Sequence, residues 1–179
     1  STLTQSSAHH AQIRSVSANG AFDVTWDFYA GHATLTVNAM PGNFWFLYEG
    51  TPGGTLGSED YWVRASGSIM GISSTFDADL PLPEWVYFVD GTLGRSLFLA
   101  RHEDDTFLEE YWNGGAMTVW GFARDGGFPA FRPALPAKLS IGLVNSTSHA
   151  TVTAAVNAAL TPPEEDVAPA APQSLRVRP

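Results

Sequence analysis

The feature that most constrains the fold is a strict alternation of apolar and polar side chains between residues 21 and 29. Apolar side chains at positions 22, 24, 26 and 28 alternate with Asp, Thr, Asp and Tyr at positions 23, 25, 27 and 29. A period of two is typical of a β-strand, whose successive side chains point to opposite faces. After Ala-Gly-His the alternation resumes at residues 33–37, which predicts an antiparallel hairpin.

Similar segments recur along the chain, separated by clusters of Gly, Pro, Asn and Asp that favour turns. Further strands are expected at residues 43–49, 60–64, 84–90, 95–102, 116–124 and 138–144. Residues 148–160 instead place apolar side chains at helical spacing behind serines that can cap a helix. The predicted fold is therefore all-β, an antiparallel β-sandwich or jelly roll with one short C-terminal helix.

The 179 residues, 44% of them apolar, are enough for one packed core. We expect residues 1–10 to form a flexible segment and residues 11–160 to form the sandwich with its helix. Residues 161–179 are rich in Pro, Ala and acid, which predicts an extended linker towards a neighbouring module. Because no run of about 18 apolar residues is present, we expect no membrane insertion.

The charge of the chain narrows the choice of partner. Its 18 acidic residues against 9 basic ones give a net charge of −9, which argues against a nucleic-acid partner and favours neutral or cationic ligands. The absence of cysteine excludes disulfides, thiolate nucleophiles and Cys-ligated zinc. A charged fraction of only 15%, with many Gly residues and aromatics, suits a secreted, extracellular module.

Six tryptophans are more than a core of this size needs. Sugars stack their apolar C–H faces on exposed indole rings, and neighbouring polar groups bond the sugar hydroxyls. We therefore expect a polysaccharide-binding surface that consists of Trp45, Trp62, Trp85, Trp112 and Trp120 together with Arg64. The alternative is that most of these rings pack between the two sheets.

The sharpest polar cluster follows the strand predicted at residues 95–102. Alternation places Arg101 on one face of that strand and His102 on the other. Glu103, Asp104 and Asp105 come next, and oxygen ligands at a strand end suit Ca²⁺. In the alternative interpretation this segment is a solvated acidic loop.

The same region supplies residue types for an enzyme that degrades polysaccharides. In a lyase, His102 would act as the base, Arg101 would neutralise a uronate carboxylate, and Tyr111 or Glu49 would complete the set of reacting groups. The net charge of −9 opposes a polyanionic substrate unless the basic residues line a locally positive groove.

Two further arrangements remain open. Glu49 and Glu84 each adjoin aromatic residues and would suit glycoside hydrolysis if they faced one another across a cleft. A metal site made of His32, His102 and His149 would need the fold to bring three scattered histidines together.

The segments Trp45-Phe-Leu-Tyr-Glu-Gly-Thr-Pro-Gly-Gly54 and Leu82-Pro-Glu-Trp-Val-Tyr-Phe88 resemble concanavalin-like β-sandwich modules of secreted bacterial proteins. The resemblance spans roughly residues 20–145 and implies contact with glycans, without assigning a role to any residue. The final stretch, Ala171-Pro-Gln-Ser-Leu-Arg-Val177, resembles the opening strand of fibronectin type III modules and implies a modular protein.

Three functional hypotheses follow from the sequence. The first is an extracellular carbohydrate-binding module with surface aromatics and a possible Ca²⁺ site. The second is a lyase or glycoside hydrolase, and the third is a structural or adhesive sandwich with protein partners.

Overall fold

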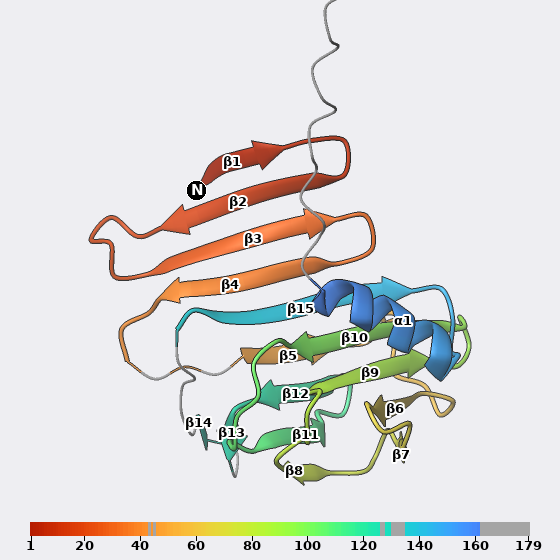
Figure 1. Ribbon diagram of the computed structural model, residues 1–179. Helices are drawn as coiled ribbons and strands as arrows, with labels where there is room; N and C mark the ends of the chain where they lie inside the picture. Colours follow the sequence, from red (N-terminus) through yellow and green to blue (C-terminus); the bar gives the residue numbers. More distant parts are fainter. Residues whose placement is uncertain (43, 45, 126–127, 130–134, 162–179) are drawn as a thin grey trace, which may run out of the picture.

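A computed structural model describes residues 1–42, 44, 46–125, 128–129 and 135–161. Two antiparallel sheets pack face to face, and one short helix lies on the outer face of the larger sheet (Figure 1). The prediction of an all-β sandwich with a C-terminal helix is confirmed. Within the described part of the chain, no helix has the length and apolarity needed to cross a bilayer.

Counted over the described residues, the large sheet has nine strands. In spatial order they are β1 (Thr2–Ser6), β2 (His10–Val16), β3 (Asp23–Tyr29), β4 (Ala33–Ala39), β15 (Ala137–Val144), β10 (Arg95–Arg101), β9 (Trp85–Asp90), β6 (Tyr61–Arg64) and β7 (Ile69–Gly71). The small sheet, counted in the same way, consists of β5 (Phe46–Gly50), β12 (Thr118–Phe122), β11 (Glu109–Asn113) and β8 (Phe76–Ala78). The strands β13 (Arg124–Asp125) and β14 (Phe128–Pro129) form a separate pair.

The N-terminal residues contain a strand that the alternation does not predict. Within residues 1–10, for which we expect a flexible segment, Thr2–Ser6 form β1, which pairs antiparallel with β2. All five side chains of β1 are exposed, so no apolar pattern marks the strand, and its backbone bonds to β2 hold it in the sheet. The linker expected at the C-terminus lies, apart from Thr161, outside the described residues.

The main core lies between the two sheets. Val86 and Phe88 of β9 and Leu97 and Leu99 of β10 point towards the small sheet. The large aromatic side chains that pack against them are Trp62, Tyr111, Trp120 and Phe122, all at most 2% exposed. Burying a side chain of this size contributes about 1.5–3 kcal/mol each to stability.

The helix α1 (His149–Leu160) covers the other face of the large sheet. Its buried residues Val152 and Val156 pack in a second apolar cluster with Trp85, Tyr87 and Phe98. The strand β9 is therefore buried on both faces, which explains its nearly continuous apolar sequence. Ser148 is the N-cap, but its side chain makes no capping hydrogen bond.

A glycine allows β15 to approach the helix-side aromatic cluster. Gly142 of β15 lies opposite Phe98 of β10 in the sheet register. A Cβ atom at Gly142 would lie 2.5 Å from a ring carbon of Phe98. Only a residue without a side chain fits beside the ring in this arrangement.

Strands β1–β4 continue the large sheet beyond the part that the small sheet covers (Figure 1). One face of this region is apolar and includes Ile13, Val24, Trp26, Phe28 and Leu35, which lie side by side in the register. None of these residues belongs to either described core cluster. The other face is polar, and it continues the side on which α1 lies.

Candidate functional site

The end of β10 separates two polar sites. Arg101 pairs with Leu139 of the inter-sheet core and lines a small apolar hollow with Phe46 and Phe122. The next residue, His102, points to the helix side, where its ring bonds Ser140. Since neighbouring strand residues face opposite ways, Arg101 and His102 lie on opposite faces of the large sheet. The structure therefore does not bring together the catalytic pair considered above.

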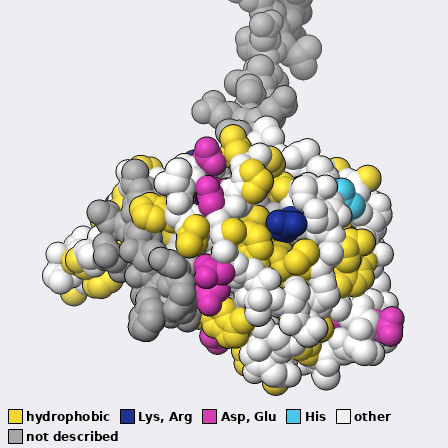
Figure 2. Space-filling model, turned by 90° about the horizontal axis from the view of Figure 1, so that it is seen from below, with side chains coloured by type: hydrophobic (Ala, Val, Ile, Leu, Met, Phe, Trp, Pro, Cys, Tyr) yellow, Lys and Arg dark blue, Asp and Glu magenta, His cyan; other side chains and the backbone are white. Residues whose placement is uncertain are grey.

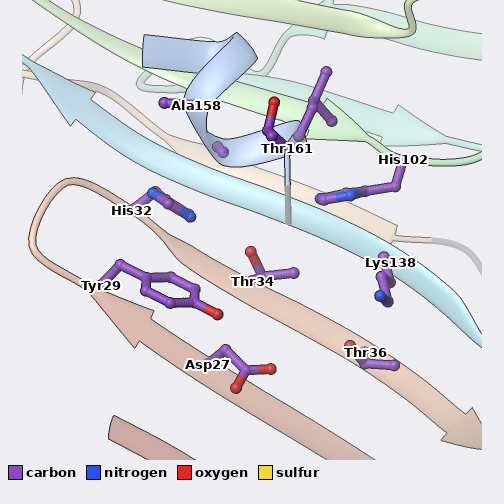
Figure 3. A pocket seen from close by; sticks show the side chains of 11 residues that line it. Asp27, Tyr29, His32, Thr34, Thr36, His102, Lys138, Ala158 and Thr161 are labelled. Atoms are coloured by element: carbon purple, nitrogen blue, oxygen red, sulfur yellow. The ribbon is translucent and has the colours of Figure 1, made fainter. Parts of the chain in front are cut away.

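A groove lies on the helix side, where the polar face of the large sheet meets the end of α1 (Figure 3). Its lining residues are Asp27 and Tyr29 of β3, His32 of the β3–β4 turn, Thr34 and Thr36 of β4, Lys138 of β15, His102, and Ala158, Ala159, Leu160 and Thr161. The hollow encloses about 140 Å³. Figure 3 shows the Tyr29 hydroxyl and the His102 ring reaching into it from opposite sides.

A row of three stacked rings forms one side of this groove. The ring centroids of His10 and Tyr29 are 4.6 Å apart with planes 7° apart, and those of Tyr29 and His32 are 4.7 Å apart at 28°. The two histidines thus flank the Tyr29 ring, and the phenol cannot offer a face for stacking. The row holds Tyr29 in place and leaves its hydroxyl directed into the groove (Figure 3).

Hydrogen bonds fix Asp27, His102 and Thr34 in the groove. Asp27 Oδ1 accepts bonds from Gln12 Nε2 and pairs with His10 Nε2, both at 2.8 Å. On the other side, the Ser140 hydroxyl lies 2.8 Å from His102 Nε2 and 2.7 Å from the Thr34 hydroxyl. These contacts fix the orientation of the side chains without a ligand.

Three lining groups remain unused. Within the described part of the chain, the Tyr29 hydroxyl, the His32 ring nitrogens and the Lys138 ammonium group have no hydrogen-bond partner in the protein. Lys138 is the single lysine of a chain whose net charge is −9, and its ammonium group and the Asp27 carboxylate both line the groove. Seen from below the view of Figure 1, the molecule shows apolar patches beside acidic side chains and a basic one (Figure 2).

Burial determines the protonation states of three titratable side chains in the groove. Burial, with Asp27 nearby, raises the pKa of Tyr29, which keeps its proton at neutral pH. Burial lowers the pKa of His32, and burial together with Lys138 and His32 lowers the pKa of His102 to about 4. Both histidines are therefore neutral at pH 7, and Lys138 carries the positive charge.

The second polar site is a buried cluster on the inter-sheet side, which we call the acid cluster: Glu84, Arg101, Asp105 and Glu109. Glu84 and Glu109 are fully buried, and Arg101 is 3% exposed. The guanidinium pairs with the Asp105 carboxylate, and its Nη1 lies 3.8 Å from Glu84 Oε2. The backbone N–H of Asp105 donates to Glu84, and the N–H of Leu80 donates to Glu109, both at 2.9 Å.

The three acids of the acid cluster are side chains of a type that can ligate a metal ion. Oxygens of Glu84, Asp105 and Glu109 all lie within 4.8 Å of one another, so the cluster could hold a metal ion. Burial raises the pKa of Glu84 to about 7 and that of Glu109 to about 8. Among described residues the three-histidine metal site is not assembled.

The predicted Ca²⁺ ligands share only one residue with this cluster. Asp105 belongs to it, whereas Asp104 is exposed to solvent. Both carboxylate oxygens of Glu103 lie within 3.0 Å of the backbone nitrogen of Lys138 and accept its N–H. The predicted ligands did not include Glu84, which precedes β9, or Glu109, which begins β11, because these residues become neighbours of Asp105 only in the fold.

The expected tryptophan surface is wrong for three of its members. Trp62 and Trp120 are 0% exposed because they pack in the core between the sheets, and Trp85 is 2% exposed because it packs under α1 in the second apolar cluster. Trp112 is half-buried on β11. Trp45 lies outside the described residues.

The other predicted contact and catalytic residues are also separated. Arg64 places its guanidinium carbon 5.5 Å from the centre of the Phe76 ring. Tyr111 is buried in the inter-sheet core and donates a 2.7 Å hydrogen bond to the carbonyl of Ile72. Glu49 is exposed on β5 of the small sheet, whereas Glu84 is fully buried, so the two carboxylates do not share an open cleft.

The chain matches no protein-family model, no curated protein and no solved structure. The sandwich is shown by the strand arrangement itself. The finer resemblance to concanavalin-like and fibronectin type III modules stays a prediction.

Proposed function

We propose that the groove between β3, β4, β15 and the end of α1 binds a carbohydrate, and that the chain is a glycan-binding module of a secreted protein. The observation that carries this proposal is the convergence of unused polar groups in one hollow. Tyr29, His32 and Lys138 all line it and have no hydrogen-bond partner among the described residues. Groups of this kind are available to a ligand that carries many hydroxyl groups.

The chemistry of the groove matches such a ligand better than an apolar one. Hydroxyl groups of Thr34, Thr36 and Thr161 line it beside the Asp27 carboxylate, so donors and acceptors are both present. Its volume of about 140 Å³ lies below the roughly 300–1,000 Å³ of sites that enclose a drug-sized molecule. We therefore infer that it holds one short part of a longer chain, with recognition by hydrogen bonds instead of ring stacking.

The test is retention of the protein in gels that contain neutral or uronic polysaccharides. Tyr29→Ala removes the hydroxyl and opens the ring row, and should weaken binding roughly tenfold. Phe28→Ala is the matched control, because Phe28 is the neighbouring aromatic residue on the opposite face of β3 and is 42% exposed. Equal retention of both variants on every polysaccharide that holds the parent protein would disprove the proposal.

A second candidate function is cleavage of a uronic polysaccharide, favoured by the grouping of Tyr29, His32 and Lys138. In β-elimination a base takes the proton next to the uronate carboxylate, the bond to the leaving glycosidic oxygen breaks, and that oxygen receives a proton. Neutral His32 is suited to take the proton, protonated Tyr29 to supply one, and Lys138 to neutralise the carboxylate.

Ultraviolet absorbance of unsaturated uronates separates cleavage from binding. A lyase would generate this signal on a uronic polysaccharide, and His32→Ala would abolish it. His9→Ala is the control, because His9 is an exposed histidine in the turn before β2. Retention without any absorbance change on the whole panel assigns binding alone to the groove.

A further inference from the structure

The acid cluster contains buried carboxylate oxygens that make no well-directed hydrogen bond with the described residues. Glu109 Oε1 and Glu84 Oε2 are two of them, and Asp105 Oδ2 has only its ion pair with Arg101. The other oxygen of each carboxylate accepts a backbone N–H, from Leu80, Asp105 and Phe107 respectively. One oxygen of each acid is thus held by a backbone N–H, and the second oxygens of Glu84 and Glu109 are left without a well-directed hydrogen bond.

A buried polar atom without a partner costs about 1–3 kcal/mol, and more when it is charged. The Arg101 guanidinium compensates only part of this cost, because it is close to Asp105 and Glu84 but forms no ion pair with Glu109. It faces the free oxygens of Asp105 and Glu84, but its own Nη1 and Nη2 also lack a well-directed hydrogen bond. No ion pair of Glu109 with a described residue is present.

The charges of the cluster leave room for one divalent cation. When all three carboxylates are ionised, as at alkaline pH, they carry −3 and the Arg101 guanidinium carries +1, so the sum is −2. A divalent ion would balance that sum inside the protein, where an unbalanced charge is costly.

We propose that Glu84, Asp105 and Glu109 bind a divalent cation with a preference for oxygen ligands, best matched by Ca²⁺. Ca²⁺ takes carboxylate oxygens at 2.3–2.6 Å, so oxygens on opposite sides of one ion lie about 5 Å apart. One oxygen from each of the three acids, all within 4.8 Å of one another, fits that span. Mg²⁺ is smaller and keeps several of its waters, for which a cluster with two fully buried acids is less suited.

The three ligands come from separate parts of the fold. Glu84 precedes β9, Asp105 lies in the loop after β10, and Glu109 begins β11 of the small sheet. A bound ion would therefore join the large sheet, the loop and the small sheet at one end of the sandwich. This role is independent of the proposed glycan groove, which lies on the other face of the large sheet.

The test measures the melting temperature and the heat of binding of the full chain at mildly alkaline pH, with Ca²⁺, with Mg²⁺ or with a chelator alone. We expect one Ca²⁺ per chain and a rise in Tm of roughly 5–10 °C at about 100 times Kd. Mg²⁺ should give a smaller rise. No binding heat and no change in Tm with either ion would overturn the proposal.

Variants locate the site. Glu109→Gln keeps the size of the side chain without its charge, and should abolish the Ca²⁺ response. Asp105→Asn does the same at a position that is 15% exposed, and serves as the second variant if Glu109→Gln does not fold. Asp104→Asn is the control in the same loop and should respond like the parent. A full response in Asp105→Asn, or its loss in Asp104→Asn, would contradict the assignment.

Discussion

Arg101 and His102 are neighbours in the chain, yet they belong to sites of opposite character. Arg101 enters the acid cluster between the sheets, where its side chain is 3% exposed. His102 enters the open groove on the other face of the large sheet. The comparison teaches that the face of the sheet on which a polar side chain lies decides what it contacts. Between the sheets its partners are other protein groups, and in the groove a ligand can reach it.

The largest contrast is expected when each of the two neighbours is shortened. Arg101→Ala leaves buried carboxylates without their cation and should lower the free energy of unfolding by about 3–5 kcal/mol. His102→Ala should cost less, about 1 kcal/mol, because it loses one bond to Ser140 at the edge of an open groove. Urea unfolding of the two variants measures both values. Equal losses of unfolding free energy would contradict the proposed difference between the buried cluster and the open groove.

The alkaline side of the stability profile tests the acid cluster. Glu109 has a pKa of about 8 in the folded protein, raised by burial from an ordinary value of 4.5. Its contribution is fully present below the ordinary value and is lost as pH rises through about 8, since only the unfolded chain ionises readily in between.

With chelator present, Tm of the parent protein should therefore fall as pH rises over this interval. Glu109→Gln should flatten the fall, and Glu84, whose pKa is about 7, accounts for the part that remains. A parent profile that is level over the same interval would show that the buried acids ionise without cost.

The acid side of the stability profile tests the groove. The expected change in stability is smaller here, because His102 is partly exposed and solvent screens its charge. Its pKa lies near 4, lowered by burial from 6.5. Its contribution is present above 6.5 and is lost as pH falls towards 4, because the unfolded chain takes up the proton first. His102→Gln should reduce this loss in thermal melts, and an unchanged slope would assign it to other groups.

Much of the fold could be predicted from side-chain alternation, because a half-buried strand records its two faces in its sequence. Alternation correctly predicted β3 and β4, and the helical spacing of apolar residues correctly predicted α1 at residues 149–160. The short strands β7 and β8 have three residues each, too few for a period to show.

The candidate sites could be predicted less well, because they depend on which faces are covered. Alternation places Trp62 and Arg64 on one side of β6, but does not tell that the small sheet buries the indole. It also places Arg101 and His102 on opposite faces, which already argues against a shared catalytic site. Tyr29 of β3 and Lys138 of β15 line the same groove because β4 lies between these two strands in the sheet. No pattern within one segment of the sequence predicts this arrangement.

The most direct test of the account is to map, by NMR chemical shifts, where an oligosaccharide contacts the protein. The oligosaccharide would come from the polysaccharide that retains the parent protein best. The account predicts that the shifted resonances cluster around Tyr29, His32, Thr36 and Lys138. Shifts centred instead on half-buried Trp112 or exposed Glu49 of the small sheet would contradict it.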